Sequence, residues 1–242
     1  MIRMSRRKRL GSLARDTSGL ALVEFAFTLP IIIAMGGWGV ELSYFALCNL
    51  RVSQYAMNLA DNSSRVGVAA AGGVTQLREA DINDVLQGTR KESAVLNLTT
   101  NGRVTLSSLI KVRQSYDNAT APRIQRIHWQ RCIGVMAGTG YDSTYGTTTA
   151  SAGSTNTLAN AGTPAPTGMG PVGRKVEAFQ DSGVMFVEIN YRYRPLFGSL
   201  FISPQIIHYA QSYVVRDNRD FTRVYNDPTT PAPVSSCDKY TV

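Results

Sequence analysis

The apolar run from Leu20 to Val40 constrains the fold of this chain more than any other feature. It contains only two polar side chains, Glu24 and Thr28. As an α-helix, about 20 residues of this kind span the ~30 Å hydrocarbon core of a bilayer. A cleavable secretory signal has a shorter apolar core of roughly 7–15 residues. The run therefore predicts one membrane-spanning helix over 20–40.

The positive charge of the chain is concentrated before this run. The formal net charge is +8, and the residues before Gly19 hold six Lys or Arg side chains and one Asp. A basic stretch beside an apolar run sets membrane orientation, so we expect the N-terminus in the cytoplasm. A basic chain also raises the possibility of nucleic-acid binding. The uneven placement of the charge argues against a nucleic-acid partner.

Few side chains are suited to metal binding or catalysis. The three cysteines form no C-x-x-C pair, and the two histidines, His128 and His208, are far apart. The acids that attract attention are Asp81, Asp84 and Glu188, and they form no recognised spacing. Glu188 is expected to be a solvent-facing partner for arginine. The sequence therefore predicts no metal site, no cofactor and no enzymatic activity.

Helical spacing continues beyond the predicted span. Apolar side chains recur mostly three or four residues apart and form one stripe. The stripe consists of Phe45, Cys48, Val52, Tyr55, Ala56, Leu59 and Ala60. We predict one helix from Gly19 to about Ser64, whose continuation over 41–66 leaves the membrane and packs on a folded domain. A coiled coil is the alternative, but the stripe is short for one.

The pattern over 67–226 predicts an α+β domain. A second helix is expected at roughly 79–96, and four further segments have the pattern of strands. The predicted strands are 103–113, 126–137, 183–196 and 206–215. Because no helical crossover separates them, an antiparallel sheet with one covered face is favoured. The predicted fold class is α+β: a long N-terminal helix, transmembrane in its first half, packed on a roughly four-stranded antiparallel sheet.

Two segments of this region lack periodic patterning. Residues 138–173 are rich in Gly, Ser, Thr, Ala and Pro and carry almost no charge. This composition predicts a flexible insertion between two strands, with a subunit contact or adhesive tip as the alternative. Residues 227–242 contain three prolines and are expected to form a loose C-terminal tail.

Two residues are unusual inside the predicted span. The Glu24 carboxylate costs ~2.5–3.5 kcal/mol in lipid on insertion scales, so it calls for a partner or a function. An acid that snorkels to the cytoplasmic interface is the alternative. Pro30 removes a helix hydrogen bond and is expected to kink the helix.

After its basic leader, the segment Gly19-Leu-Ala-Leu-Val-Glu24-Phe25 resembles a type IV prepilin processing site of the Flp/Tad kind. In that pattern a glycine ends the leader, a glutamate lies five residues further on, and an aromatic residue follows. The wider stretch 18–32 resembles the start of TadE-like (TadE/TadG-type) pilus assembly proteins. The segment around 191–217, with Tyr-Arg-Tyr-Arg-Pro-Leu-Phe, resembles their C-terminal half. The resemblance covers about 15–65 and 184–220.

The resemblance implies a non-enzymatic pseudopilin that is required to assemble a Tad/Flp-type pilus and its secretion machine. A prepilin peptidase would remove the leader, residues 1–19, between Gly19 and Leu20. The implied partners are the inner membrane, that peptidase, and other Tad pilus and pseudopilin subunits. The protein would lie in the bacterial inner membrane as a single-pass protein with a periplasmic domain, or in a surface pilus. The alternative is a membrane-tethered periplasmic binding or adhesion module.

Cleavage after Gly19 would free an α-amino group on Leu20, which is cationic at neutral pH because its pKa is ~7.7–8.0. Glu24 would lie little more than one helical turn away, and within reach of a neighbouring subunit's N-terminus. Pairing the two charges offsets much of the cost of burying either. We therefore expect Glu24, beside Phe25, to support assembly by neutralising a processed N-terminus.

The periplasm is an oxidising compartment, where cysteines tend to pair. We expect a disulfide between Cys132, on a predicted strand, and Cys237, in the tail. This bond would join the loose C-terminus to the sheet. Cys48 lies on the helical stripe and is expected to be a small buried side chain.

Overall fold

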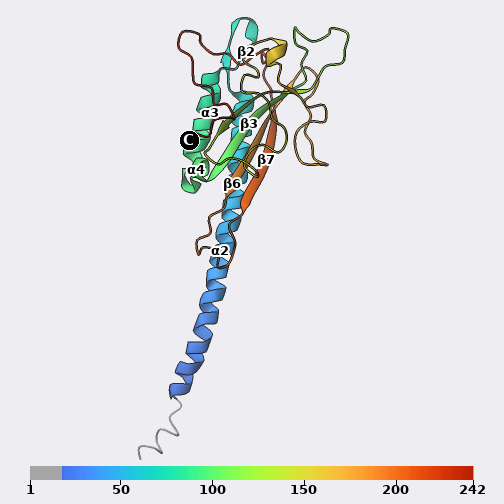
Figure 1. The fold of residues 1–242 in the computed structure, drawn as a ribbon. Coiled ribbons are helices and arrows are strands. Elements are labelled where there is room, and N and C mark those ends of the chain that lie inside the picture. The colour runs from blue at the N-terminus through green and yellow to red at the C-terminus, as the bar shows by residue number, and fades with distance from the viewer. Residues whose placement is uncertain (1–17, 242) are drawn as a thin grey trace, which may run out of the picture. The chain divides into compact units, whose positions relative to one another are not determined.

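Helix α2 (Ser18–Arg65) is the first element of the chain that the structure describes. The computed structural model describes residues 18–241. Two units divide them: an N-terminal unit of residues 18–45 and 195–203, and a sheet unit of residues 46–194 and 204–241. The helix is drawn in blue in Figure 1 and runs through Pro30 without interruption. Its bounds agree with the prediction to within one residue.

The first half of α2 exposes its apolar side chains. Large apolar residues from Leu20 to Val40 are between about two fifths and three quarters exposed, Leu22 and Phe27 among them. By length and composition this helix is able to cross a membrane, and its most apolar window is not buried within the protein. The structure thus supports the predicted span as a helix whose large apolar side chains remain exposed among the described residues.

The second half of α2 belongs to the sheet unit and buries the predicted stripe. Cys48, Val52, Ala56 and Ala60 are fully buried, as expected for a face that packs on a domain. The end of the helix is held by Arg219. Its guanidinium donates to the carbonyl oxygens of the last turn, which have no partner within the helix. These are Ser63 at 3.1 Å, Ser64 at 3.2 Å and Val66 at 2.8 Å.

The remaining elements form two sheets with short helices between them. In chain order they are β1 (Val68–Ala69), η1 (Ala71–Gly73), β2 (Thr75–Gln76), α3 (Glu79–Glu92), η2 (Ser93–Leu96), α4 (Leu98–Asn101), β3 (Gly102–Ile110), β4 (Arg126–Ile133), η3 (Leu158–Asn160), β5 (Thr163–Pro164), β6 (Gly183–Arg192) and β7 (Ile206–Val214). β1 and β2 pair with each other, and the main sheet has the order β5-β4-β3-β6-β7.

The main sheet confirms the predicted α+β class. All four of its pairings are antiparallel, and β3, β4, β6 and β7 correspond to the four predicted strands. The fifth strand, β5, is only two residues long and comes from the segment that was predicted to be a flexible insertion. The strands end earlier than predicted because Gly134 and the stretch before Pro195 leave the ladder.

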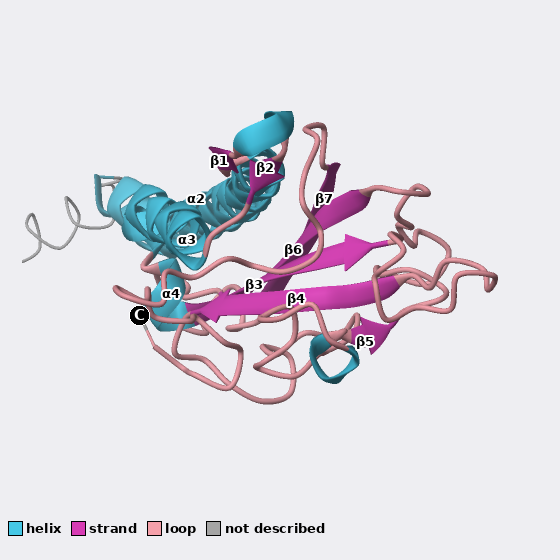
Figure 2. Cartoon of the chain, turned by 90° about the horizontal axis from the view of Figure 1, so that it is seen from above, coloured by secondary structure: helices cyan, strands magenta, loops and turns pink. Residues whose placement is uncertain are grey.

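Both faces of the sheet are covered, which differs from the predicted single covered face. Figure 2 shows helix α3 on one side of the strands and the loops around β5 on the other. Every residue of β3 and of β4 is buried. Alternating polar residues in these strands suggested a solvated face. In the folded protein that polar face lies under another part of the chain.

Residues 138–173 provide much of this second cover. Tyr145 packs edge-on against Phe186 of β6, with ring centroids 5.7 Å apart. Met169 is buried in an apolar cluster with Leu109 and Ile127. The segment therefore packs on the strands, which its composition alone did not indicate. Its small and polar residues lie close to the strands, as shown by Gly162, where an added Cβ would stand 2.1 Å from the Ile127 carbonyl oxygen.

A β-bulge in β4 changes which side chains share a face. Ser108 pairs with Trp129 and Leu109 pairs with Ile127, so His128 has no partner residue on β3. The extra residue places Ile127 and Trp129 on opposite faces. A strict alternation with period two would place these two side chains on the same face, so the bulge changes the face that one of them occupies.

A buried ion pair connects α3 to the sheet. The Arg131 guanidinium on β4 donates to both carboxylate oxygens of Glu79, in the first turn of α3, with an Nε–Oε2 distance of 2.9 Å. Both side chains are at most 3% exposed. Because two buried charges compensate each other here, the position of α3 depends on both being present.

We predict that Glu79→Ala lowers the free energy of unfolding by about 3–5 kcal/mol, because it leaves the Arg131 charge buried and unpaired. Urea unfolding of the full chain in detergent micelles, followed by circular dichroism, measures the loss. The matched control is Arg65→Ala, which removes the exposed pair with Asp61 and should cost roughly 0–1 kcal/mol. Equal effects of the two variants would contradict this account of α3.

Candidate functional site

The predicted processing and pairing residues lie together at the start of α2. Gly19 and Leu20 are helical, and Glu24 and Phe25 follow in the next turn. Leu20 and Glu24 are four residues apart, which places them on one face of the helix with a rise of about 6 Å between them. Leu20 is 62% exposed and Phe25 is 59% exposed. A cleaving enzyme or a neighbouring helix thus finds this surface uncovered by the described chain.

The Glu24 side chain is exposed among the described residues. Within residues 18–241 its carboxylate takes part in no hydrogen bond or ion pair. The nearby Thr28 hydroxyl donates instead to the backbone carbonyl of Glu24 at 3.0 Å, which satisfies the one other polar side chain of the run. The basic residues of the predicted leader, 1–17, lie outside the described residues.

Pro30 lines an apolar groove of the N-terminal unit. Residues 195–203 follow β6, and together with α2 they form an apolar groove within the N-terminal unit. The groove is lined by Leu29, Pro30, Ile33, Ala34, Gly37, Phe197, Leu200 and Phe201. The ring of Phe201 approaches so closely that a Cβ on Gly37 would stand 3.0 Å from it.

Glu41 is a residue of this region that the sequence reasoning missed. It is fully buried. Its Oε1 accepts the backbone N–H of Leu196 at 3.2 Å, and its Oε2 accepts that of Phe197 at 3.0 Å. The available signal was its position, since Glu41 is the first charged residue after the apolar run.

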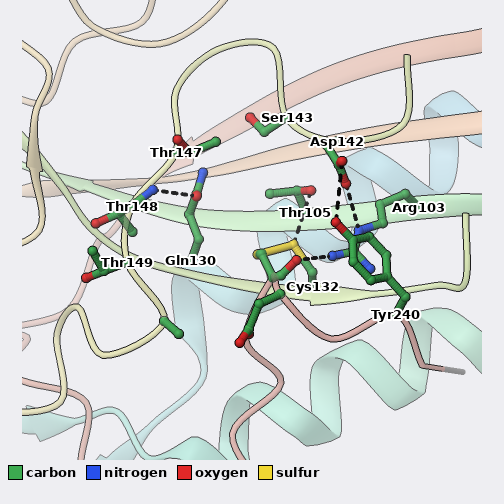
Figure 3. Close-up of a pocket in the computed structure, with 13 residues that line it drawn as sticks. Arg103, Thr105, Gln130, Cys132, Asp142, Ser143, Thr147, Thr148, Thr149 and Tyr240 are labelled. Carbon is green, nitrogen blue, oxygen red and sulfur yellow. Dashed lines mark hydrogen bonds and ion pairs between the residues drawn. A yellow bond between two sulfur atoms is a disulfide. The ribbon is translucent and has the colours of Figure 1, made fainter. Parts of the chain in front are cut away.

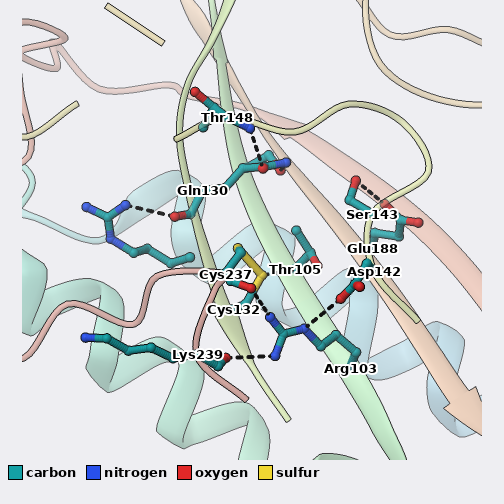
Figure 4. The surroundings of a disulfide bond; sticks show 12 residues. Arg103, Thr105, Gln130, Cys132, Asp142, Ser143, Thr148, Glu188, Cys237 and Lys239 are labelled. Atoms are coloured by element: carbon teal, nitrogen blue, oxygen red, sulfur yellow. Dashed lines mark hydrogen bonds and ion pairs between the residues drawn. A yellow bond between two sulfur atoms is a disulfide. The ribbon is translucent and has the colours of Figure 1, made fainter. Parts of the chain in front are cut away.

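In the sheet unit, the expected disulfide between Cys132 and Cys237 is present, with Cα atoms 4.8 Å apart. Figure 4 shows Arg103 beside it. This buried guanidinium donates to the carbonyl oxygens of Cys237 at 2.5 Å and Lys239 at 2.9 Å, and to that of Gly134 at 2.8 Å. The described part of the tail, 227–241, is therefore joined to the sheet by the disulfide, by Arg103 and by backbone hydrogen bonds such as that from Cys132 N–H to the Ser235 carbonyl oxygen at 2.7 Å.

A small polar pocket of about 290 Å³ lies next to the disulfide. Figure 3 shows Arg103, Asp142 and Tyr240 along one side of it, and threonines of the insertion along the other. The Arg103 guanidinium lies 4.1 Å from the Tyr240 ring centroid and 3.6 Å from Asp142. Since the terminal nitrogens of Arg103 already bind carbonyls of the tail, this arrangement anchors the tail and provides no free cationic group for a ligand.

Glu188 was expected to face solvent and to pair with arginine. In the structure it is 1% exposed, so the expected exposure was wrong. Its carboxylate accepts the Ser143 hydroxyl at 2.7 Å and both the backbone N–H and the hydroxyl of Thr144 at 3.1 Å. These bonds join the insertion to β6. The Ser143 hydroxyl donates to a carboxylate and not to a histidine, so the pair is not arranged as a nucleophile with its base.

The other titratable residues considered as candidate site residues are Asp81, Asp84 and His208, and they take part in separate contacts. Asp81 binds Arg78 at 2.6 Å and caps α3, while Asp84 is exposed. His208 receives or donates a 2.8 Å hydrogen bond with the Tyr145 hydroxyl. In the described part of the chain, no three His, Cys, Asp or Glu side chains gather in a way that could hold a metal ion.

Comparison of the chain with protein-family models, with curated proteins and with solved structures finds no match. The functional interpretation therefore depends on the geometry of the chain itself and on the residues at the start of α2.

His128, the extra residue of the bulge, is 1% exposed. Burial lowers its pKa from 6.5 to about 4. The backbone of Ala161 opposes this shift, and the positive charges of Arg126 and Arg131 add to it. The folded protein therefore keeps His128 neutral over a pH range in which the unfolded chain binds a proton.

We predict that the His128 contribution to stability is complete above pH 6.5 and is lost as the pH falls from about 6.5 to about 4. The pKa difference corresponds to about 3 kcal/mol. Urea unfolding between pH 7.5 and 4.5, compared with His128→Gln, isolates this loss from that of the carboxylates. Parallel curves for wild type and His128→Gln would show that His128 is not the group responsible.

Proposed function

We propose that this protein is a pilin-like membrane component of a Tad/Flp-type pilus assembly system, without enzymatic activity. The observation that carries the proposal is the surface formed by Gly19, Leu20, Glu24 and Phe25 at the start of a helix of 48 residues. That helix exposes its apolar side chains over its first half and bears a folded domain on its second half. A subunit that is anchored in a membrane and assembles through its helix requires these two parts.

In this proposal α2 crosses the bacterial inner membrane once, with the leader in the cytoplasm and the sheet unit in the periplasm. The orientation is supported by the basic residues before Gly19. The compartment is supported by the disulfide between Cys132 and Cys237, because such bonds persist in oxidising surroundings. The partners are a prepilin peptidase and other pilus or pseudopilin subunits.

The chemistry of assembly follows from the spacing at the helix start. Removal of the leader after Gly19 leaves a cationic amine on Leu20, one turn from the Glu24 carboxylate. In lipid an isolated carboxylate costs ~2.5–3.5 kcal/mol, and an amine of the same or a neighbouring subunit offsets part of that cost. A subunit whose leader is intact lacks this amine, so its helix has less tendency to associate through Glu24.

We predict that the mature chain begins at Leu20 and that Gly19→Val leaves the leader attached. Nothing lies within 4 Å of a Cβ placed on Gly19, so the larger side chain disturbs no described contact. Gly39→Val is the matched control, since Gly39 is equally open, and it should be processed normally. N-terminal sequencing of chains from cells with an active prepilin peptidase decides the question. A wild-type chain that still begins at Met1 would favour a simple anchor and thus a tethered binding or adhesion module.

We further predict that Glu24→Gln abolishes or strongly reduces pilus assembly while Glu24→Asp retains most of it, because only the charged side chain can neutralise the amine. Processing at Leu20 is measured in the same samples, so that a defect in cleavage is separated from a defect in assembly. Sheared surface filaments and cross-linked membrane complexes give the two readouts. Normal assembly of the Glu24→Gln variant would rule out the pairing mechanism.

A further inference from the structure

The segment Pro195–Ser203 leaves the sheet after β6 and packs on the apolar half of α2 within the N-terminal unit. We infer that the side chains of this segment, here called the apolar loop, insert into the same lipid leaflet that the outer part of the α2 span occupies. The occupant of the apolar groove between loop and helix is then lipid acyl chains. The inference rests on the proposed membrane-spanning role of α2, and its test separates the two.

The first argument is the chemistry of the loop surface. Leu196, Phe197 and Leu200 are 53%, 46% and 75% exposed, and no charged residue occurs between Pro195 and Ser203. Gly198 has a φ of +63°, a left-handed conformation that favours glycine, and it separates the two apolar pairs Leu196–Phe197 and Leu200–Phe201. An apolar surface of this kind in water marks a protein or membrane contact.

The second argument is depth. The groove involves α2 residues from Leu29 to Gly37, all of which lie within the predicted span over 20–40. At 1.5 Å per residue, these positions lie roughly 5 to 16 Å inward from the outer end of that span. A loop that contacts them cannot remain in water if the span is in lipid. The outer part of this range, about 5–10 Å, is typical of apolar segments that lie in the interfacial part of a leaflet.

The third argument concerns the hydrogen bonds of the backbone in the apolar loop. Irregular chain is tolerated at membrane depth only where its polar groups find partners. The buried Glu41 carboxylate accepts the N–H groups of Leu196 and Phe197, where the chain enters the loop. Residues 196–201 then continue in turns. The Glu41 carboxylate thus pairs two backbone N–H groups, which would otherwise lie unpaired in lipid.

Side chains near this level suit a membrane interface. Trp38 on α2 is 54% exposed, and tryptophan is enriched where the hydrocarbon meets the headgroups. Arg194, the residue before the loop, is exposed and carries a charge that headgroup phosphates can bind. Residues suited to an interface thus occur near the end of the predicted span and next to the apolar loop in the sequence, which favours lipid over a second protein chain as the cover of the groove.

The test uses the full chain in phosphatidylcholine–phosphatidylglycerol vesicles, in a Cys48→Ala background with the native disulfide intact. A nitroxide is attached at Leu200→Cys, at Ile33→Cys on α2, or at Val172→Cys, which is 96% exposed in the sheet unit. Frequent collisions of the nitroxide with oxygen indicate that the label lies in lipid. Frequent collisions with a nickel chelate indicate that the label lies in water. We expect the Leu200 label to behave like the Ile33 label, with frequent oxygen and rare nickel collisions, and the Val172 label to show the reverse.

Each other outcome overturns the inference in a distinguishable way. A Leu200 label open to nickel beside an Ile33 label in lipid would remove the loop from the membrane and leave the span intact. Nickel access at both positions would refute the span, and with it the proposed function. Protection of the Leu200 label from both reagents would show that protein covers the loop.

Variants of Glu41 test whether its carboxylate holds the apolar loop in lipid. We expect Glu41→Ala to raise nickel collisions at the Leu200 label, because it exposes two unpaired amides, while Glu41→Gln keeps a carbonyl acceptor and has a smaller effect. The Ile33 and Val172 labels are measured in the same variants and should not change. An unchanged Leu200 label in Glu41→Ala would show that the carboxylate does not hold the loop in lipid.

Discussion

One uninterrupted helix, α2, presents two different surfaces along its length, and the rest of the structure depends on how they are divided. Over its first half α2 exposes apolar side chains such as Leu22 and Phe27, which are stable in contact with lipid. Over its second half it buries a narrow stripe that includes Val52 and Ala56. Helical hydrogen bonds satisfy the backbone of both halves, so the exposed surface changes along the helix without a change of secondary structure.

Periodicity made this helix predictable, and it made the four long strands predictable for the same reason. The stripe repeats every three or four residues, and Tyr191 and Tyr193 alternate with Arg192 and Arg194 in the strand β6 and just after it. The two tyrosines are buried and the two arginines are exposed. Where a pattern has one period and one buried face, sequence alone indicates both the element and its orientation.

The second cover of the sheet could not be inferred in this way. Residues 138–173 have no period, and their composition is that of a flexible segment. Their contacts depend on single long-range hydrogen bonds, such as that from Thr148 N–H to Gln130 and those from Ser143 and Thr144 to Glu188. A buried polar residue with a partner far away in sequence has the same local signature as a polar residue in solvent. The bulge at His128 adds one residue to β4 and is equally invisible to a pattern of period two.

The two carboxylates of the apolar half of α2 show how burial of an acid can be compensated in different ways. Glu41 receives two backbone N–H groups from Leu196 and Phe197, so its compensation lies within the fold. Glu24 has no such partner among residues 18–241, and the helix around it is exposed. If both acids are placed in lipid, the first is part of a stable structure and the second requires a donor from outside the described chain. The simplest donor at that depth is an N-terminal amine one turn away or on a neighbouring helix, and this connects the energetic need of Glu24 to the cleavage at Gly19 and the assembly that we propose.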